Sequence, residues 1–99
     1  MHDPETCETM TDLRAVIDAL DADLVALLAR RQACIDRAVT LKQAEGVPAR
    51  VPARIDEVLQ KVRAQAEAQG LDPALADTLW RTMIEWAIAR EARVLGDAG

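Results

Sequence analysis

LRAVIDALDADLVALLARRQACIDRAVTLK, residues 13–42, is the stretch that decides the fold, because its apolar residues recur in alternating steps of four and three. The recurring positions are Leu13, Ile17, Leu20, Leu24 and Leu27. This heptad pattern is typical of a helix that packs along one face against another helix. We therefore expect one long helix from about Thr11 to about Ala44, roughly 50 Å in length.

Two breaks divide the rest of the chain. The first is EGVPARVPAR, residues 45–54, and the second is QGLDP, residues 69–73. Between them we expect a second helix from about Pro52 to Gln69, because proline suits the first helical turn and glycine suits the position after the last. A third helix is expected to start at Asp72-Pro73 and to end at Gly96.

No part of the chain alternates in the way a strand does, so the fold class is all-α, with three helices in a single domain over residues 1–99. Residues 1–10 are expected to form a flexible tail. Two short helices cannot cover an apolar face of roughly 50 Å from end to end. We therefore expect a homodimer in which the long helices of two copies meet at the centre.

The composition argues against several functional classes. The net charge of −5 disfavours nucleic-acid binding, which depends on neutralising phosphates. No apolar run approaches the roughly 20 residues that a membrane span requires, and the polar N-terminus does not read as a signal peptide. Cys7 and Cys34 have no metal-site spacing. A reduced cytoplasmic protein is the expectation.

Two cations interrupt the apolar face of the first helix. Continuing the heptad count places Arg31 on that face, and Lys42 follows eleven residues later. Eleven residues make about three helical turns, so both lie on one side, roughly 16 Å apart along the axis. Their long side chains could converge on one small ligand with two anionic groups. Alternatively, both could bury their stems and keep their charged ends in water.

Two further arginines fit a plain helical bundle poorly. Arg54 falls in the first turn of the second helix, where a cation opposes the helix dipole, and a helix N-terminus with added arginine can bind an anion. Arg14 lies about 25 Å of helix axis from Arg31, so only an antiparallel partner helix could bring both to one ligand. The alternative for each is a solvated surface residue.

Glu91 interrupts the apolar stripe of the third helix. It is either a carboxylate at the edge of the stripe, paired with Arg90 or another neighbour, or an enclosed group. Enclosure favours the neutral form of a carboxyl group, which can then donate a proton in a hydrogen bond.

The sequence offers no activated nucleophile, no glycine-rich phosphate loop and no metal-ligand cluster. What remains is a set of fixed cations and one carboxylate. Such a set suits a reaction without a metal, a cofactor or a covalent intermediate, in which positioning and electrostatics lower the barrier.

In these residues the chain resembles the helical AroQ-class chorismate mutases. The first helix of that family contains LR..ID..D..LV.LL..R and ends with LK, as residues 13–42 do here. A loop with proline and an arginine that opens the second helix corresponds to VPARVPARI, residues 47–55. GLDP, residues 70–73, matches the turn before the third helix, and IAREA, residues 88–92, matches the Gln or Glu near its end.

The resemblance implies an intertwined three-helix homodimer that rearranges chorismate, a small dianion, to prephenate in aromatic amino acid biosynthesis. By resemblance, Arg14 reaches from one subunit into the site of the other. Arg31 and Lys42 bind the carboxylates and the ether-oxygen side of the substrate. Arg54 holds the other end, and Glu91 hydrogen-bonds the ether oxygen.

Two positions depart from the mutase pattern. Many mutases have acidic residues where this chain has Val51 and Ile55. The related isochorismate–pyruvate lyases also lack these acids and have a similar PE.C segment, here residues 4–7, but they normally carry Gln at the position of Glu91. We expect a mutase. A lyase that forms salicylate and pyruvate is the first alternative, and a dimeric helical interaction module without activity is the second.

Overall fold

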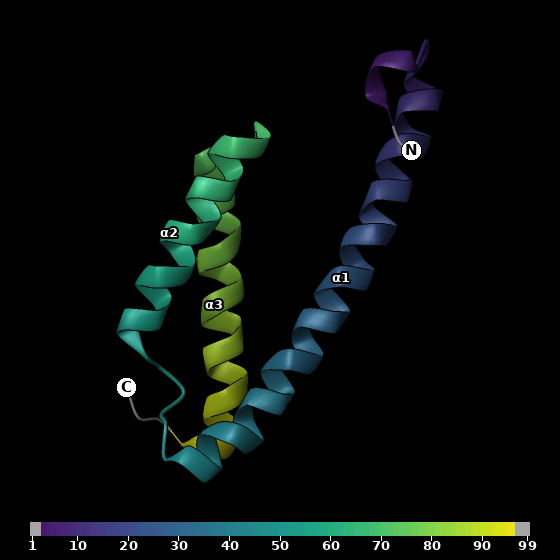
Figure 1. The fold of residues 1–99 in the computed structure, drawn as a ribbon. Helices are drawn as coiled ribbons and strands as arrows, with labels where there is room; N and C mark the ends of the chain where they lie inside the picture. The colour runs from purple at the N-terminus through teal and green to yellow at the C-terminus, as the bar shows by residue number, and fades with distance from the viewer. Residues whose placement is uncertain (1–2, 97–99) are drawn as a thin grey trace. The chain divides into compact units, whose positions relative to one another are not determined.

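The computed structural model describes residues 3–96 as a 3-10 turn, η1 (Pro4–Thr6), followed by three α-helices (Figure 1). The helices are α1 (Met10–Glu45), α2 (Pro52–Gln69) and α3 (Pro73–Leu95). No strand occurs between residues 3 and 96. The prediction of an all-α chain with one long and two shorter helices is therefore confirmed.

The first residues form more local structure than the expected tail. Residues 1 and 2 lie outside the described part of the chain. In η1 the backbone N–H of Glu5 donates to the Asp3 side chain at 3.0 Å, which is the usual way in which an aspartate starts a helical turn. The Thr9 hydroxyl then accepts a hydrogen bond of 3.1 Å from the N–H of Asp12 and starts α1.

The ends of α1 and α2 are set by glycine. Gly46 has a φ of 70° and Gly70 a φ of 75°, both in the left-handed region that glycine adopts without steric cost. The N–H of Val47 donates to the carbonyl of Lys42 at 2.9 Å, and the N–H of Leu71 donates to Ala66 at 2.8 Å. These bonds satisfy carbonyl groups that each helix end would otherwise leave free.

The chain divides into two compact units, Met1–Cys34 and Ile35–Gly99. The first contains η1 and the N-terminal part of α1. The heptad side chains of this part are exposed, with Leu24 at 55% and Leu27 at 58%. Within the described residues of this unit no second α-helix exists to cover them.

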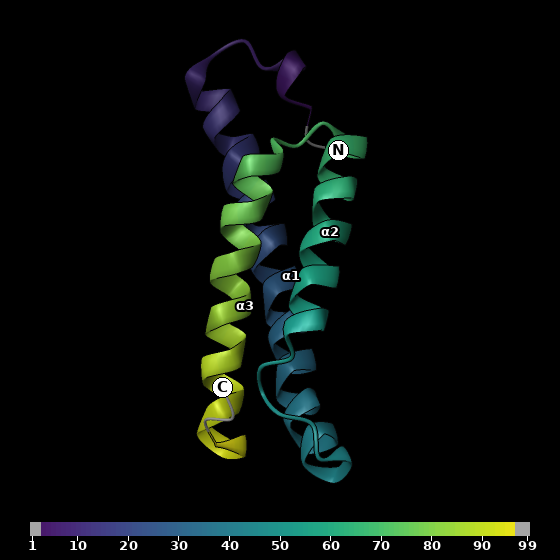
Figure 2. The same ribbon diagram turned by 90° about the vertical axis from the view of Figure 1, so that its left-hand side faces the viewer.

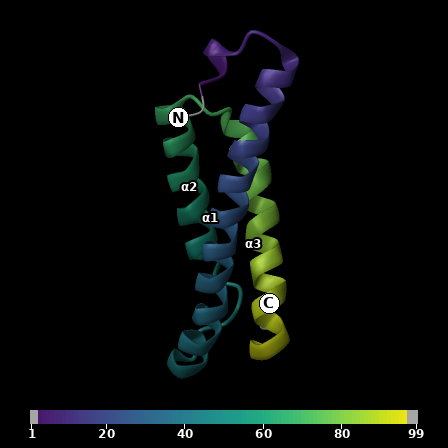
Figure 3. The same cartoon turned by 90° about the vertical axis from the view of Figure 1, so that its right-hand side faces the viewer.

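The second unit contains the last turns of α1 together with α2 and α3. Helices α2 and α3 lie side by side and antiparallel, and Figures 2 and 3 show the short turn that joins them. Asp72 caps α3 by accepting a hydrogen bond of 2.9 Å from the N–H of Ala74. Arg63 of α2 donates to Asp77 of α3, which also accepts from Arg81, so this carboxylate joins the two helices.

Most of the buried apolar residues of the second unit are alanines. They are Ala49, Leu59, Ala66, Ala76, Ile84 and Ala87. Alanine allows two helices to approach closely, but it removes little apolar area from water, and hydrophobic stabilisation scales with that area. Larger apolar side chains, among them Leu75, Leu79 and Trp86, remain exposed. The unit therefore keeps apolar surface that its own residues do not cover.

Candidate active site

The buried charged pair of the second unit is formed by Lys42 and Glu91. Lys42 lies in the last turn of α1 and Glu91 near the end of α3. Lys42 Nζ is 2.7 Å from Glu91 Oε1, and the two side chains are 21% and 5% exposed. Of the two interpretations of Glu91, the enclosed carboxyl group is therefore the one observed, and its partner is Lys42 rather than Arg90.

The loop after α1 gives Lys42 a second contact. Lys42 Nζ donates a hydrogen bond of 2.9 Å to the carbonyl oxygen of Ala49. Gly46 ends the helix and turns the chain back, which brings buried Ala49 within reach of the lysine seven residues earlier. The ammonium group is thus held between a carbonyl oxygen and a carboxylate.

The buried oxygen of Glu91 depends on Lys42 for its compensation. Oε1 lies 2.7 Å from the Lys42 ammonium group, although the contact is not aligned as a hydrogen bond. Oε1 has no other hydrogen-bond partner among the described residues. The positive charge of Lys42 is therefore what offsets the burial of this carboxylate.

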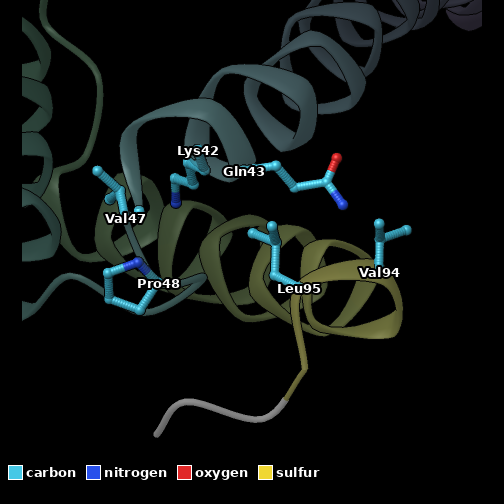
Figure 4. A pocket seen from close by; sticks show the side chains of 7 residues that line it. Lys42, Gln43, Val47, Pro48, Val94 and Leu95 are labelled. Atoms are coloured by element: carbon cyan, nitrogen blue, oxygen red, sulfur yellow. The ribbon is translucent and has the colours of Figure 1, made fainter.

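An open cavity of about 380 Å³ lies beside Lys42, where the C-terminal ends of α1 and α3 meet. It is lined by Lys42, Gln43, Gly46, Val47, Pro48, Val94 and Leu95. Lys42 extends from α1 toward the α3 ribbon, whereas Gln43 extends toward Val94 (Figure 4). Apart from Lys42, the lining side chains carry no charge, so the lysine is the group that gives this cavity its electrostatic character.

Arg54 lies in the first turn of α2, where the sequence placed it. Its side chain is 62% exposed and pairs with Glu57 one turn later. The hydrogen bond from Arg54, with the charge of Lys61 nearby, lowers the pKa of Glu57. Arg54 is thus an accessible cation, and its pair with Glu57 is one that a ligand could replace at little cost.

Arg14 and Arg31 belong to the first unit. Arg14 is exposed and Arg31 is half-buried, whereas the adjacent Arg30 is exposed. Of the proposed site residues, Lys42 and Glu91 are the two that the structure brings into contact. The two arginines of the first unit are placed on α1 as the sequence indicated, each on its own helical turn.

Two ion pairs beside the site were not foreseen from the sequence. Asp36 of α1 pairs with Arg90 of α3, and Arg50 of the loop pairs with Glu85 of α3 through two hydrogen bonds of 2.9 and 2.6 Å. The hydrogen bond from Arg50 lowers the pKa of Glu85. All four residues lie outside the apolar stripes of the sequence, so the hydrophobic pattern does not indicate which of them pair.

No group of three or more His, Cys, Asp or Glu side chains is placed to hold a metal ion between residues 3 and 96. In the same part of the chain, none of the helices combines the length and the apolar character needed to cross a membrane.

The comparison with known families gives one match that covers most of the chain. The family model of chorismate mutase type II covers residues 13–92. The chain therefore belongs to the type II chorismate mutase family, and the resemblance noted in the sequence is confirmed.

The curated relatives include enzymes of different names. An isochorismate pyruvate lyase of Pseudomonas aeruginosa is 34% identical over 94 residues, which are 94% of this chain and 91% of that protein. A T-protein of Haemophilus influenzae is 32% identical over 85% of this chain. A T-protein of Enterobacter agglomerans is 39% identical over 77% of it. The matched regions are 22% and 21% of the two T-proteins, about a fifth of each.

Proposed function

We propose that the chain is a chorismate mutase, which rearranges chorismate to prephenate. The observation that carries the proposal is the Lys42–Glu91 pair, in which Glu91 Oε1 lies 2.7 Å from the Lys42 ammonium group. The rearrangement breaks a C–O bond as a C–C bond forms within one molecule, so negative charge develops at the ether oxygen. The Lys42 ammonium group, fixed before the substrate arrives, stabilises that charge more than it stabilises the ground state. The Glu91 carboxyl group can donate a hydrogen bond to the same oxygen only in its protonated form.

The remaining cations are proposed to bind the substrate carboxylates. Arg31 and Lys42 take the side near the ether oxygen, and Arg54 takes the opposite end. Since Arg54 is exposed in the single chain, substrate binding must replace its pair with Glu57. The substrate is thereby held in the compact conformer from which the new bond forms.

The active form is proposed to be an intertwined homodimer of a single domain, residues 1–99, in the cytoplasm. The exposed apolar side chains of α1, including Leu24 and Leu27, support it. A core composed largely of alanine is a weak basis for independent stability in so short a chain. In this dimer Arg14 of one subunit completes the site of the other.

An isochorismate–pyruvate lyase is the second candidate. One observation favours it: the lyase relative matches along nearly its entire length, unlike the T-proteins. The half-buried Val51 and Ile55 at the start of α2 also agree with it, since they offer no acid to the substrate hydroxyl. Glu91, where a lyase normally has glutamine, argues for the mutase.

A product assay separates the candidates. Purified protein is given chorismate and isochorismate separately, and both mixtures are resolved by chromatography. We expect prephenate from chorismate, with little pyruvate from isochorismate. Faster formation of salicylate and pyruvate from isochorismate would assign the lyase instead. A folded protein that forms neither product would favour the helical interaction module.

A further inference from the structure

The Asp36–Arg90 pair joins the same two helices, α1 and α3, as the Lys42–Glu91 pair does. Arg90 Nε donates to Asp36 Oδ1 at 2.6 Å, and Arg90 Nη2 donates to Oδ2 at 3.1 Å. Two parallel hydrogen bonds between a planar guanidinium and a planar carboxylate fix both the distance and the orientation of the partners. This pair is therefore a geometric restraint between α1 and α3.

A third contact holds Arg90 on its own helix. Its guanidinium carbon lies 5.3 Å from the ring centre of Trp86, one turn earlier on α3. A cation over an indole ring is attracted by the electrons of the ring face. Hydrogen bonding between the partners raises the pKa of Arg90 and lowers that of Asp36, so both remain charged at neutral pH. The restraint therefore persists wherever the enzyme works.

The same two helices carry the proposed catalytic pair. Glu91 follows Arg90 directly, and Lys42 lies six residues after Asp36. Backbone packing in this unit is concentrated between α2 and α3, so side-chain pairs have a large share in joining the last turns of α1 to α3. A shift of α3 along or around its axis would move Arg90 and Glu91 together.

We infer that Asp36 and Arg90 are positioning residues, which hold Glu91 at its distance from Lys42 and thereby set the rate of turnover. The inference rests on the proposed function of the Lys42–Glu91 pair. Exposed ion pairs add little to stability, so the main consequence of losing this one is geometric. Displacements of about 1 Å at a catalytic group can cost up to about 10²-fold in rate.

Asp36→Asn and Arg90→Lys test the inference. The lysine variant keeps the positive charge but loses the two-pronged geometry, so it separates orientation from electrostatics. For both variants we expect kcat to fall about 10-fold or more, with little change in KM or in the midpoint of thermal unfolding. Asp77→Asn is the matched control, because it removes a carboxylate that binds an arginine from another helix away from Lys42. It should leave kcat unchanged.

Wild-type kcat in both Asp36→Asn and Arg90→Lys would overturn the inference. An equal fall in kcat in Asp77→Asn would overturn it as well, because the loss would then come from a general loosening of the helix packing and not from the position of Glu91. A second readout does not depend on turnover. The carboxyl-carbon resonance of Glu91, assigned by its absence in Glu91→Gln, should shift in Asp36→Asn. If the wild-type chain rearranges neither substrate, the proposed function fails, while an unshifted resonance would still refute the positioning role.

Discussion

Lys42 and Glu91 form an ion pair that stability alone does not explain. Removing two charges from water costs several kcal/mol per ion, and a close contact repays this only when the remaining polar atoms are also satisfied. Here the contact itself, 2.7 Å between Glu91 Oε1 and Lys42 Nζ, is not aligned as a hydrogen bond. A well-packed apolar pair would serve the α1–α3 contact at least as well, so the charged pair is better explained by a ligand.

Lys42→Met separates these two roles. The variant leaves the buried Glu91 carboxylate without its cation, so we expect a loss of about 2–3 kcal/mol in the free energy of unfolding, less than for a fully buried pair because Lys42 is partly exposed. Adding Glu91→Leu should restore most of the stability without restoring turnover. Urea denaturation and the prephenate assay measure the two effects. If Lys42→Met were as stable as the wild type, the ion pair would contribute nothing to the free energy of unfolding.

Arg31 and Arg30 offer a matched pair of substitutions on one helix. Arg31 is half-buried on the apolar stripe, whereas Arg30 next to it is exposed. Arg31→Ala should fold with the same helical content but lose about 10²-fold or more in kcat/KM, since a charge-assisted contact to the substrate is removed. Arg30→Ala should retain wild-type kinetics. Full activity in Arg31→Ala would end its assignment to the site.

At the scale of elements, Asp77 links the stability of the α2–α3 pair to pH. Hydrogen bonds from Arg81 and Arg63 hold the pKa of Asp77 below its ordinary value of 3.8. A lowered pKa in the folded state stabilises the protein above the unfolded pKa, and this contribution is lost as the pH falls through the folded value. The urea midpoint of the wild type should therefore decline more steeply below about pH 4 than that of Asp77→Asn.

The control for this prediction is Asp56→Asn, which changes an exposed carboxylate of α2. It should retain the steep wild-type decline. Equal acid sensitivity in Asp77→Asn and in the wild type would mean that the contacts of Asp77 with the two arginines persist in the unfolded chain or contribute nothing to folding.

The bounds of the elements could be predicted because local chemistry sets them. Pro52, Gly70 and the Asp72-Pro73 pair mark helix ends through backbone restrictions that act within a few residues, and the structure ends or begins a helix at each. The first helix begins at Met10, close to the expected Thr11, because the Thr9 hydroxyl caps it.

The pairing of charged side chains could not be predicted in the same way. Arg90 is adjacent in sequence to Glu91, but on a helix adjacent residues point about 100° apart. It bonds instead to Asp36, while Glu91 meets Lys42. Such choices depend on how α1 and α3 meet, which periodicity does not specify. The stripe position of Glu91 indicated burial, and the identity of its partner required the structure.

At the scale of the whole molecule, the exposed apolar face of α1 supports the proposed dimer. Leucines exposed by about half of their surface at successive heptad positions are typical of a helix that packs against another chain. In the proposed dimer this face would be covered, and the alanine core of α2 and α3 would be supplemented by contacts between subunits. Arg14 and Lys42 of one site would then come from different chains.

Mixed dimers test that arrangement. Arg14→Ala and Lys42→Ala chains, each inactive alone, are unfolded together, refolded in equal amounts and assayed. About half of the dimers should combine one chain of each kind, and each of these has one intact site, so about a quarter of wild-type activity should return. The matched control mixes Lys42→Ala with Glu91→Ala. Because Lys42 and Glu91 meet within one chain, neither site is intact in that mixture and no activity should return.

The two mixtures together locate each residue in a subunit. Native mass spectrometry first establishes that mixed dimers have formed. If they have, and the Arg14→Ala and Lys42→Ala mixture stays inactive, then Arg14 serves the site of its own subunit and the intertwined arrangement is wrong. Recovery of activity only in that mixture would mean that a site needs two chains. The long helix would then be required for catalysis as well as for stability, because the apolar face that joins the subunits also delivers Arg14.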